Sequence, residues 1–252
     1  MKSHFPLMLD RPETSTVISG ATYLCISFVF FPFMGIMFAQ DESQMLYGAW
    51  IDIFYHLCNA VLAVCIFLRY LKDSFLNVQV YKKLFWATVG ICTAAVVVLK
   101  IVIFGLSCLV GDEVFFQSAF GGLLTVEMEL EVHSSFLVLE QPLWGTLVLV
   151  LACPFAISCL LYAGVFAPIC TSRPWLAYVV VTAVLLLLRG VMIFNFWSSD
   201  LELMLFFISL PVHLLACLSY HITDTVWAPI AVHSFSNLVM ALLVHLLVAP
   251  LL

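Results

Sequence analysis

Long apolar runs separated by short polar segments dominate the chain from one end to the other. Most of these runs have the length of about 20 residues that a helix needs to cross a bilayer. The pattern predicts seven membrane spans, at roughly 16–39, 46–70, 83–110, 142–168, 174–196, 202–220 and 225–249. We therefore expect an all-α fold, a polytopic transmembrane helical bundle of about seven spans.

One segment, 112–140, departs from this pattern. It carries Glu127, Glu129 and Glu131 at alternate positions, which favours an acidic loop outside the membrane or a short interfacial element. No internal repeat or low-complexity stretch interrupts the chain. We therefore expect a single membrane domain over 1–252, with N-terminal spans and the acidic outer loop in 1–140 and a second group of spans in 141–252.

The composition supports a membrane protein. Of the 252 residues, 64% are hydrophobic and 10% are charged, whereas a soluble domain is about half apolar and roughly a quarter charged. The net charge of −6 and the absence of a basic tract argue against nucleic acid as a partner. The nine cysteines form no CxxC pair and nearly all lie in apolar runs, so we expect no disulfide framework, no metal site and no cofactor.

The charges between the spans alternate in sign. The basic residues Lys2, Arg11, Arg69, Lys72, Lys82, Lys83 and Arg173 lie at the N-terminus or after even-numbered spans. The acidic residues Asp41, Glu42, Asp112, Glu113, Glu127, Glu129, Glu131, Glu140, Asp200 and Glu202 follow odd-numbered spans. The positive-inside rule then places the N-terminus in the cytoplasm, and seven spans place the C-terminus outside.

His233 and Asn237 stand out in the last span. A separation of four residues puts both on one face of a helix, and polar groups inside a membrane are costly. They can serve as a hydrogen bond between helices that stabilises the bundle, or as part of a catalytic site.

The second span carries a polar stripe. Asp52, His56 and Asn59 share one helix face, which is typical of a polar seam facing the bundle, a proton path or a counter-ion for a ligand. Lys100 and Arg189 lie deep in other spans, so we expect Asp52 to pair with at least one of them.

A further histidine, His213, lies beside Pro211 in the sixth span. Proline frees a backbone carbonyl, which the imidazole can satisfy, or the ring can line a cavity.

The segment "YHITDTVWAPIAVHSFSNLV" resembles the last motif of the CAAX-protease and bacteriocin-processing family, also called the Abi family. The matching positions are Tyr220, Thr223, Trp227, Ala228, Pro229, His233 and Asn237. The resemblance covers roughly 150–245 and implies a CAAX-protease-like core in 141–252.

The catalytic residues of that family are missing upstream. Where the family has "EELLFRG", this chain has "SCLLYAG", with Ser158 and Cys159 at the glutamate positions and Ala163 at the arginine position. Asn195 occupies the histidine position of the middle motif, F-x-x-x-H. The resemblance implies that Ser158, Cys159, Ala163, Asn195, His233 and Asn237 line one degenerate cavity.

In the family, the glutamate and the histidines are thought to activate a water that cleaves a peptide bond. Loss of the carboxylates removes this base, so we expect a catalytically inactive protein that binds or regulates a membrane or envelope protein, a peptide or a membrane lipid. The resemblance also suits a bacterial plasma membrane. The alternative is an intramembrane peptidase in which Cys159 is the nucleophile, His233 the base and Asn237 its orienter. A small transporter or immunity-type protein is a third interpretation, based on Asp52, Lys100 and Arg189.

Overall fold

The computed structural model describes residues 22, 45–121, 123, 142–195 and 199–248, and all of its regular elements are helices. The first predicted span, 16–39, and most of the acidic segment lie outside the described residues. The elements are α3 (Met45–Val80), α4 (Lys82–Val110), α5 (Glu113–Gly121), α7 (Pro142–Leu147), η3 (Val148–Ala152), α8 (Cys153–Ser158), η4 (Cys159–Phe166), α9 (Ala167–Cys170), α10 (Pro174–Asn195), α11 (Ser199–Thr223), α12 (Trp227–Leu243) and η5 (Val244–Val248). Elements labelled η are π-helical.

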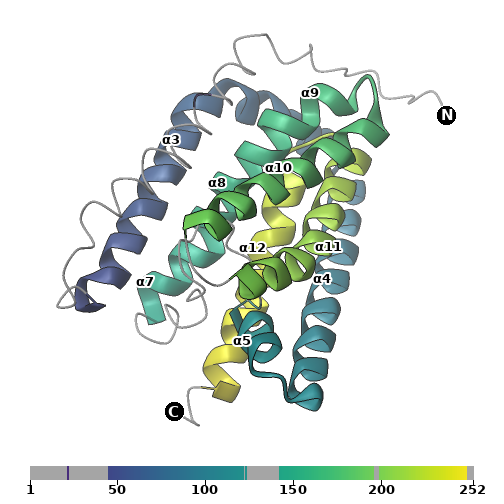
Figure 1. Ribbon diagram of the computed structural model, residues 1–252. Coiled ribbons are helices and arrows are strands. Elements are labelled where there is room, and N and C mark those ends of the chain that lie inside the picture. The colour runs from purple at the N-terminus through teal and green to yellow at the C-terminus, as the bar shows by residue number, and fades with distance from the viewer. Residues whose placement is uncertain (1–21, 23–44, 122, 124–141, 196–198, 249–252) are drawn as a thin grey trace.

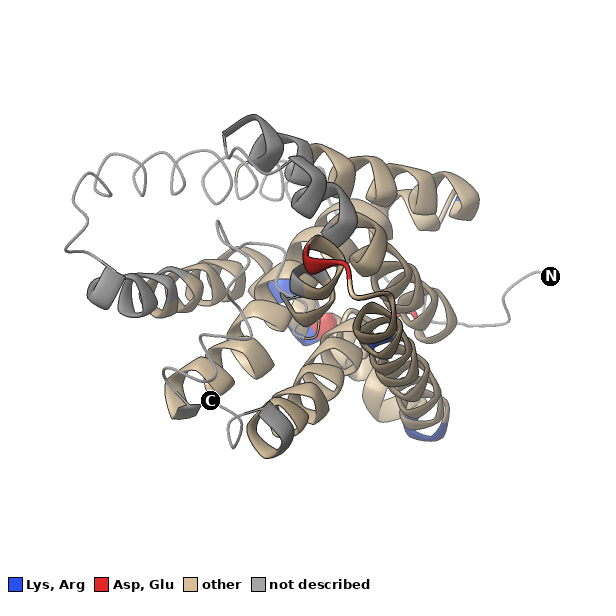
Figure 2. Cartoon of the chain, turned by 60° about the horizontal axis from the view of Figure 1, so that its bottom comes forward, with Lys and Arg blue, Asp and Glu red and all other residues tan. Residues whose placement is uncertain are grey.

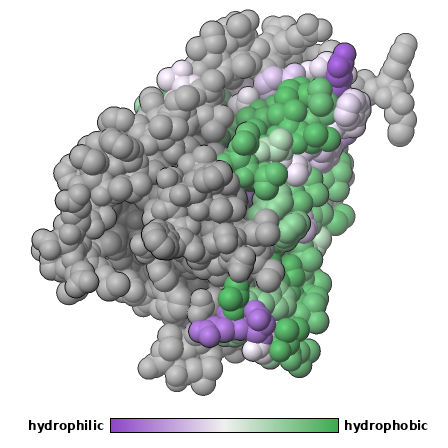
Figure 3. Space-filling view, in the orientation of Figure 1, coloured by the Kyte–Doolittle hydropathy of each residue, from purple (hydrophilic) through white to green (hydrophobic). Residues whose placement is uncertain are grey.

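The described elements are all helices, and their lengths and apolar composition are compatible with a membrane protein. Four stretches among the described residues are long and apolar enough to cross a membrane: Lys82–Val110, Leu143–Cys170, Phe206–Thr223 and Trp227–Leu246. A shorter apolar stretch, Pro174–Leu187, forms most of α10. Figure 2 shows how few charged positions interrupt these helices, and Figure 3 shows an apolar surface over much of the described part. Such a surface suits lipid as the solvent.

The stretch Leu143–Cys170 is the central span of the bundle. Of its most apolar window 78% is buried, against 22% for α4. It runs continuously through α7, η3, α8, η4 and α9, with α3 on one side and α12 on the other (Figure 1). The helices α3, α10, α11 and α12 pack on this span, so its buried Ser158 and Tyr162 side chains face protein and not lipid.

The helix α5 folds back into the bundle after α4 ends. Gly111 ends α4 with φ 71, and the Asp112 carboxylate accepts a hydrogen bond from the Phe115 amide at 2.8 Å, which caps the new helix. α5 then packs against α4 and α11, and Leu123 is buried. The described part of the segment, 112–121 and 123, is therefore mainly a helix that packs on the spans. Glu127, Glu129 and Glu131 lie outside the described residues, so the acidic loop or interfacial element stays a prediction.

The buried end of this segment lies at membrane depth. The Leu123 carbonyl accepts a hydrogen bond from the Lys100 ammonium at 2.8 Å. Lys100 lies about 15 Å along α4 from its end at Val110, at 1.5 Å per residue. A carbonyl that deep needs a donor from the protein, because the bilayer core offers none.

Candidate functional site

Two π-helical segments, η3 and η4, widen the central span. Each contains a carbonyl that loses its usual donor to a proline four residues later. Pro154 has no amide proton for the Val150 carbonyl in η3, and Pro168 has none for the Gly164 carbonyl in η4. Local π geometry is one way in which membrane helices accommodate such prolines, and it is frequent at functional sites. The sequence thus alters the backbone at the two places that meet polar residues of α12.

One of these places, at η4, holds a cluster of three aromatic side chains. The hydroxyl of Tyr162 in η4 lies 2.8 Å from Nδ1 of His213 in α11 and 2.9 Å from Nε2 of His233 in α12. All three residues are fully buried, at 0% exposure. The rings of Tyr162 and His233 are stacked with centroids 5.9 Å apart, and the two imidazole centroids are 5.1 Å apart. We call these residues the His–Tyr–His cluster.

The hydrogen bonds of this cluster couple the tautomers of its two imidazoles. A phenol has one proton, so it donates to one neutral imidazole and accepts an N–H from the other. The tautomer of His213 therefore fixes that of His233 whenever both rings are neutral. One hydroxyl group from the central span thus connects α11 to α12.

At the other place, η3, Asn237 bonds to the backbone of the central span and to Lys100. The Asn237 amide donates to the Leu149 carbonyl at 2.9 Å, and its oxygen accepts from the Lys100 ammonium at 3.3 Å. All of these groups are buried. Asn237 therefore acts as a donor toward one span and as an acceptor toward another, which accounts for an amide at this position.

The structure places the remaining predicted residues as follows. His56 and Asn59 are buried on α3, at 1% and 0% exposure, as a polar seam facing the bundle requires. The side chains of Asp52, Arg189 and Asn195 lie outside the described residues. The pairing of Asp52 with Lys100 or Arg189 therefore stays a prediction, as does the place of Asn195 in a shared cavity.

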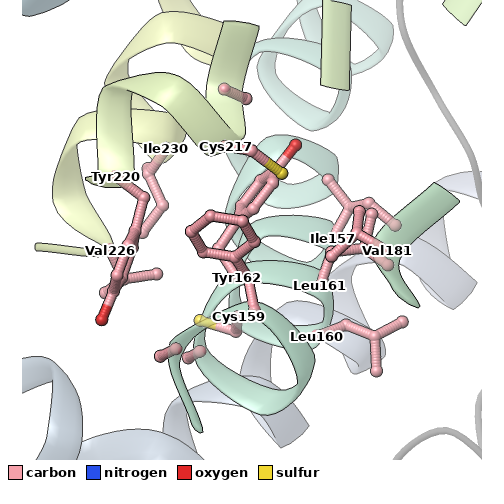
Figure 4. Packing of buried hydrophobic residues seen from close by; sticks show 14 of the residues in the cluster. Ile157, Cys159, Leu160, Leu161, Tyr162, Val181, Cys217, Tyr220, Val226 and Ile230 are labelled. Carbon is pink, nitrogen blue, oxygen red and sulfur yellow. The ribbon is translucent and has the colours of Figure 1, made fainter. Parts of the chain in front are cut away.

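The residues at the family's glutamate and arginine positions lie in the apolar core. Ser158, Cys159 and Ala163 are each at 0% exposure. Cys159 and Ala163 belong to the largest cluster of buried hydrophobic residues, which Figure 4 shows around Tyr162. Within the described part of the chain, no hydrogen bond joins the Cys159 thiol to His233, and the Ser158 hydroxyl has no hydrogen-bond partner.

The sequence did not predict the roles of two residues in the cluster, Tyr162 and His213. Tyr162 lies in the segment "SCLLYAG" but is not among the residues that the resemblance places in the cavity, and His213 is predicted only to satisfy a carbonyl freed by Pro211 or to line a cavity. The available signal was the hydroxyl itself, because a tyrosine in the middle of an apolar span usually needs a hydrogen-bond partner. The partner could not be read from the sequence, since His213 and His233 are 51 and 71 positions away.

The turn between α11 and α12 is fixed to the end of α3. The Ser74 and Thr225 hydroxyls are 2.7 Å apart, and the Trp227 indole N–H donates to the Leu71 carbonyl at 2.9 Å. Asn77 donates to the backbone carbonyl of Asp224 at 2.8 Å. The motif residue Trp227 thus helps to set where α12 begins, and with it the position of His233.

Asp224 occupies an unusual backbone and electrostatic position in this turn. Its φ of 51 lies in the left-handed region, which glycine adopts readily, asparagine and aspartate tolerate, and most other residues avoid. Burial raises the pKa of its carboxyl above the ordinary value, and nearby His221 partly opposes that rise. The carboxyl therefore adds an energetic cost to the fold whenever it is ionised.

No described group of three histidine, cysteine, aspartate or glutamate side chains could hold a metal ion. The chain matches no family model, no curated protein and no solved structure.

Proposed function

We propose that the chain is a catalytically inactive membrane protein on a CAAX-protease-like scaffold. In this proposal it binds or regulates a partner protein, peptide or lipid of the membrane or envelope. The observation that carries the proposal is the position of the Tyr162 hydroxyl between His213 and His233. A water-activating site needs an imidazole nitrogen that faces a water, and here the phenol takes Nδ1 of His213 and Nε2 of His233.

The resemblance gives this tyrosine a chemical meaning. In the aligned segments "SCLLYAG" and "EELLFRG", Tyr162 stands where the family has phenylalanine. The hydroxyl group that tyrosine has and phenylalanine lacks is the group that bridges the two imidazoles. We infer that His213, rather than Asn195, supplies the second histidine of the degenerate set, because it lies beside His233.

The proposed orientation places the N-terminus in the cytoplasm and the C-terminus outside, in a bacterial plasma membrane. α4 supports this orientation, because it begins with exposed Lys82 and Lys83 and is followed by exposed Asp112 and Glu113. The positive-inside rule assigns the lysine end to the cytoplasm.

The alternative is an intramembrane peptidase with Cys159 as nucleophile and His233 as base. A thiolate nucleophile needs an electropositive and partly hydrated setting. Cys159 instead lies in the apolar cluster at 0% exposure, and Nε2 of His233 faces Tyr162. These contacts favour the inactive protein.

A cleavage assay separates the two functions. The purified wild type, reconstituted in liposomes, should leave a library of quenched fluorescent peptides uncut. Cys159→Ala and His233→Ala should then equal the wild type. Cleavage by the wild type that Cys159→Ala abolishes would replace the proposal with the thiol mechanism, and cleavage that only His233→Ala abolishes would indicate a histidine-dependent hydrolase.

Binding is tested by crosslinking and pull-down from native membranes. A specific partner should be captured by the wild type and lost or weakened in His233→Ala. Leu242→Ala, at a lipid-facing position of α12, is the matched control and should retain the partner. Equal capture by all three proteins would show that the inherited site does not bind the partner.

A further inference from the structure

The end of α3 and the start of α4 form an exposed corner that is both apolar and basic. The helix α3 has 36 residues and is therefore about 54 Å long, well beyond the roughly 30 Å of a bilayer core. Figure 1 shows it passing from one side of the bundle toward the start of α4. The corner surface consists of Lys72, Phe75, Leu76, Lys82, Lys83 and Trp86.

The exposed side chains of the corner surface combine two kinds of chemistry. Phe75, Leu76 and Trp86 are 43%, 54% and 56% exposed, which is unfavourable in water. Lys72 shares a helix face with Phe75 and Leu76, and Lys82 and Lys83 lie within a helical turn of Trp86. Aromatic rings beside lysines are typical of the membrane interface, where the ring lies among the acyl chains and the ammonium reaches the headgroups.

We propose that this corner surface binds the headgroups of anionic phospholipids. Three lysines lie within twelve positions of the sequence, and Asp73 is the acidic residue among them, so the surface carries a net positive charge. The apolar residues hold the corner at the bilayer surface, and the lysines meet the phosphates there. Each lysine near an anionic surface raises the affinity about fivefold.

The same helical turns also hold the α11–α12 turn in place. Ser74 bonds to Thr225 and Asn77 to the Asp224 carbonyl, while the Leu71 carbonyl accepts from Trp227. Phe75 also packs edge-on against the Trp227 ring, with centroids 5.7 Å apart. A bound headgroup therefore stabilises the helical turns that set the entry of α12.

The test uses Trp86 as the reporter. The protein is placed in mixed vesicles that contain brominated phosphatidylglycerol or brominated phosphatidylcholine, and the quenching of Trp86 is obtained by subtracting the signal of Trp86→Phe. The anionic lipid should quench the wild type more strongly at equal mole fraction. The variant with Lys72→Gln, Lys82→Gln and Lys83→Gln should lose this preference by more than about fivefold.

A matched pair of single variants separates a local site from the general charge of this part of the protein. Lys83→Gln should lower the preference, and Arg173→Gln, an exposed base in the α9–α10 connection, should leave it unchanged. Equal quenching of the wild type by the two lipids would refute the proposal. So would equal effects of the two variants, or loss of the preference on adding free inorganic phosphate.

Discussion

Replacing Tyr162 by phenylalanine tests the His–Tyr–His cluster most directly. The change removes one oxygen atom and leaves the buried ring in place, so packing is preserved. That atom makes two hydrogen bonds, at 2.8 Å to His213 and 2.9 Å to His233. Hydrogen bonds inside membrane proteins are worth roughly 0.6 kcal/mol on average and up to about 1.7. The variant should therefore lose about 1–3 kcal/mol of unfolding free energy.

The assay is reversible unfolding in mixed detergent micelles, followed by circular dichroism. Tyr178→Phe is the matched control, because the Tyr178 hydroxyl contacts His221 at 3.3 Å in an exposed setting. Its loss should stay below about 0.5 kcal/mol, since water replaces an exposed hydrogen bond. Equal losses from the two variants would refute the argument that burial makes the Tyr162 hydroxyl important.

A double-mutant cycle assigns the loss to the proposed contacts. His213→Phe keeps a ring at that position and removes the nitrogen that faces Tyr162. If the two groups interact, the combined loss should differ from the sum of the single losses by more than about 0.5 kcal/mol. Strict additivity would mean that Tyr162 and His213 act independently, and the coupled cluster would then be wrong.

Four further results are expected. Burial raises the pKa of Asp224, so its contribution to stability is fully present below the unfolded pKa of about 4 and is lost as the pH rises through the folded pKa. Asp224→Asn should abolish this fall of the unfolding free energy with rising pH, and an unchanged pH profile would show that Asp224 does not cause it. Trp227→Phe removes the bond to the Leu71 carbonyl and should cost about 0.5–1.5 kcal/mol, whereas Trp175→Phe, at an exposed position, should cost nothing measurable. Asp52→Asn should lower thermal stability in detergent, since removing one partner of a buried ion pair costs about 3–5 kcal/mol, and neutralising the paired base should recover part of it; wild-type stability would exclude the pair. Cysteines introduced at positions 80 and 128 should react with an impermeant reagent only from the cytoplasm and only from outside, respectively, and labelling of both from one side would refute the topology.

Part of the candidate site follows from local spacing. Four residues separate His233 from Asn237, and this spacing alone predicts a shared face on α12. Both side chains are buried, as a shared face toward the bundle requires. The partners are a different matter, because Tyr162 and Leu149 lie 71 and 88 positions away from the residues that they bind. No local pattern contains that information.

For the charged residues, too, the sequence predicted the need for a partner but not which partner it would be. The sequence indicated that Lys100 is deep in a span and needs a partner, since a bare ammonium there is expensive. The partner it suggested was Asp52, the acidic residue within a predicted span. The described contacts of Lys100 include the amide of Asn237 and the carbonyl at Leu123. The second exists because α5 returns to the bundle, and the short apolar segment EVFFQSAFG does not by itself indicate which helices it will contact.

The sequence by itself determined that this is a helical membrane protein and where most of its spans lie. Hydropathy is a local property, and a backbone surrounded by lipid must satisfy its own hydrogen bonds, so each long apolar run becomes a helix. The tertiary structure alone decided which helices meet and which polar groups pair. Lipid is as apolar as the side chains, so the hydrophobic effect selects no particular neighbour. Close packing and a few buried hydrogen bonds, among them those of Tyr162 and Asn237, make that choice.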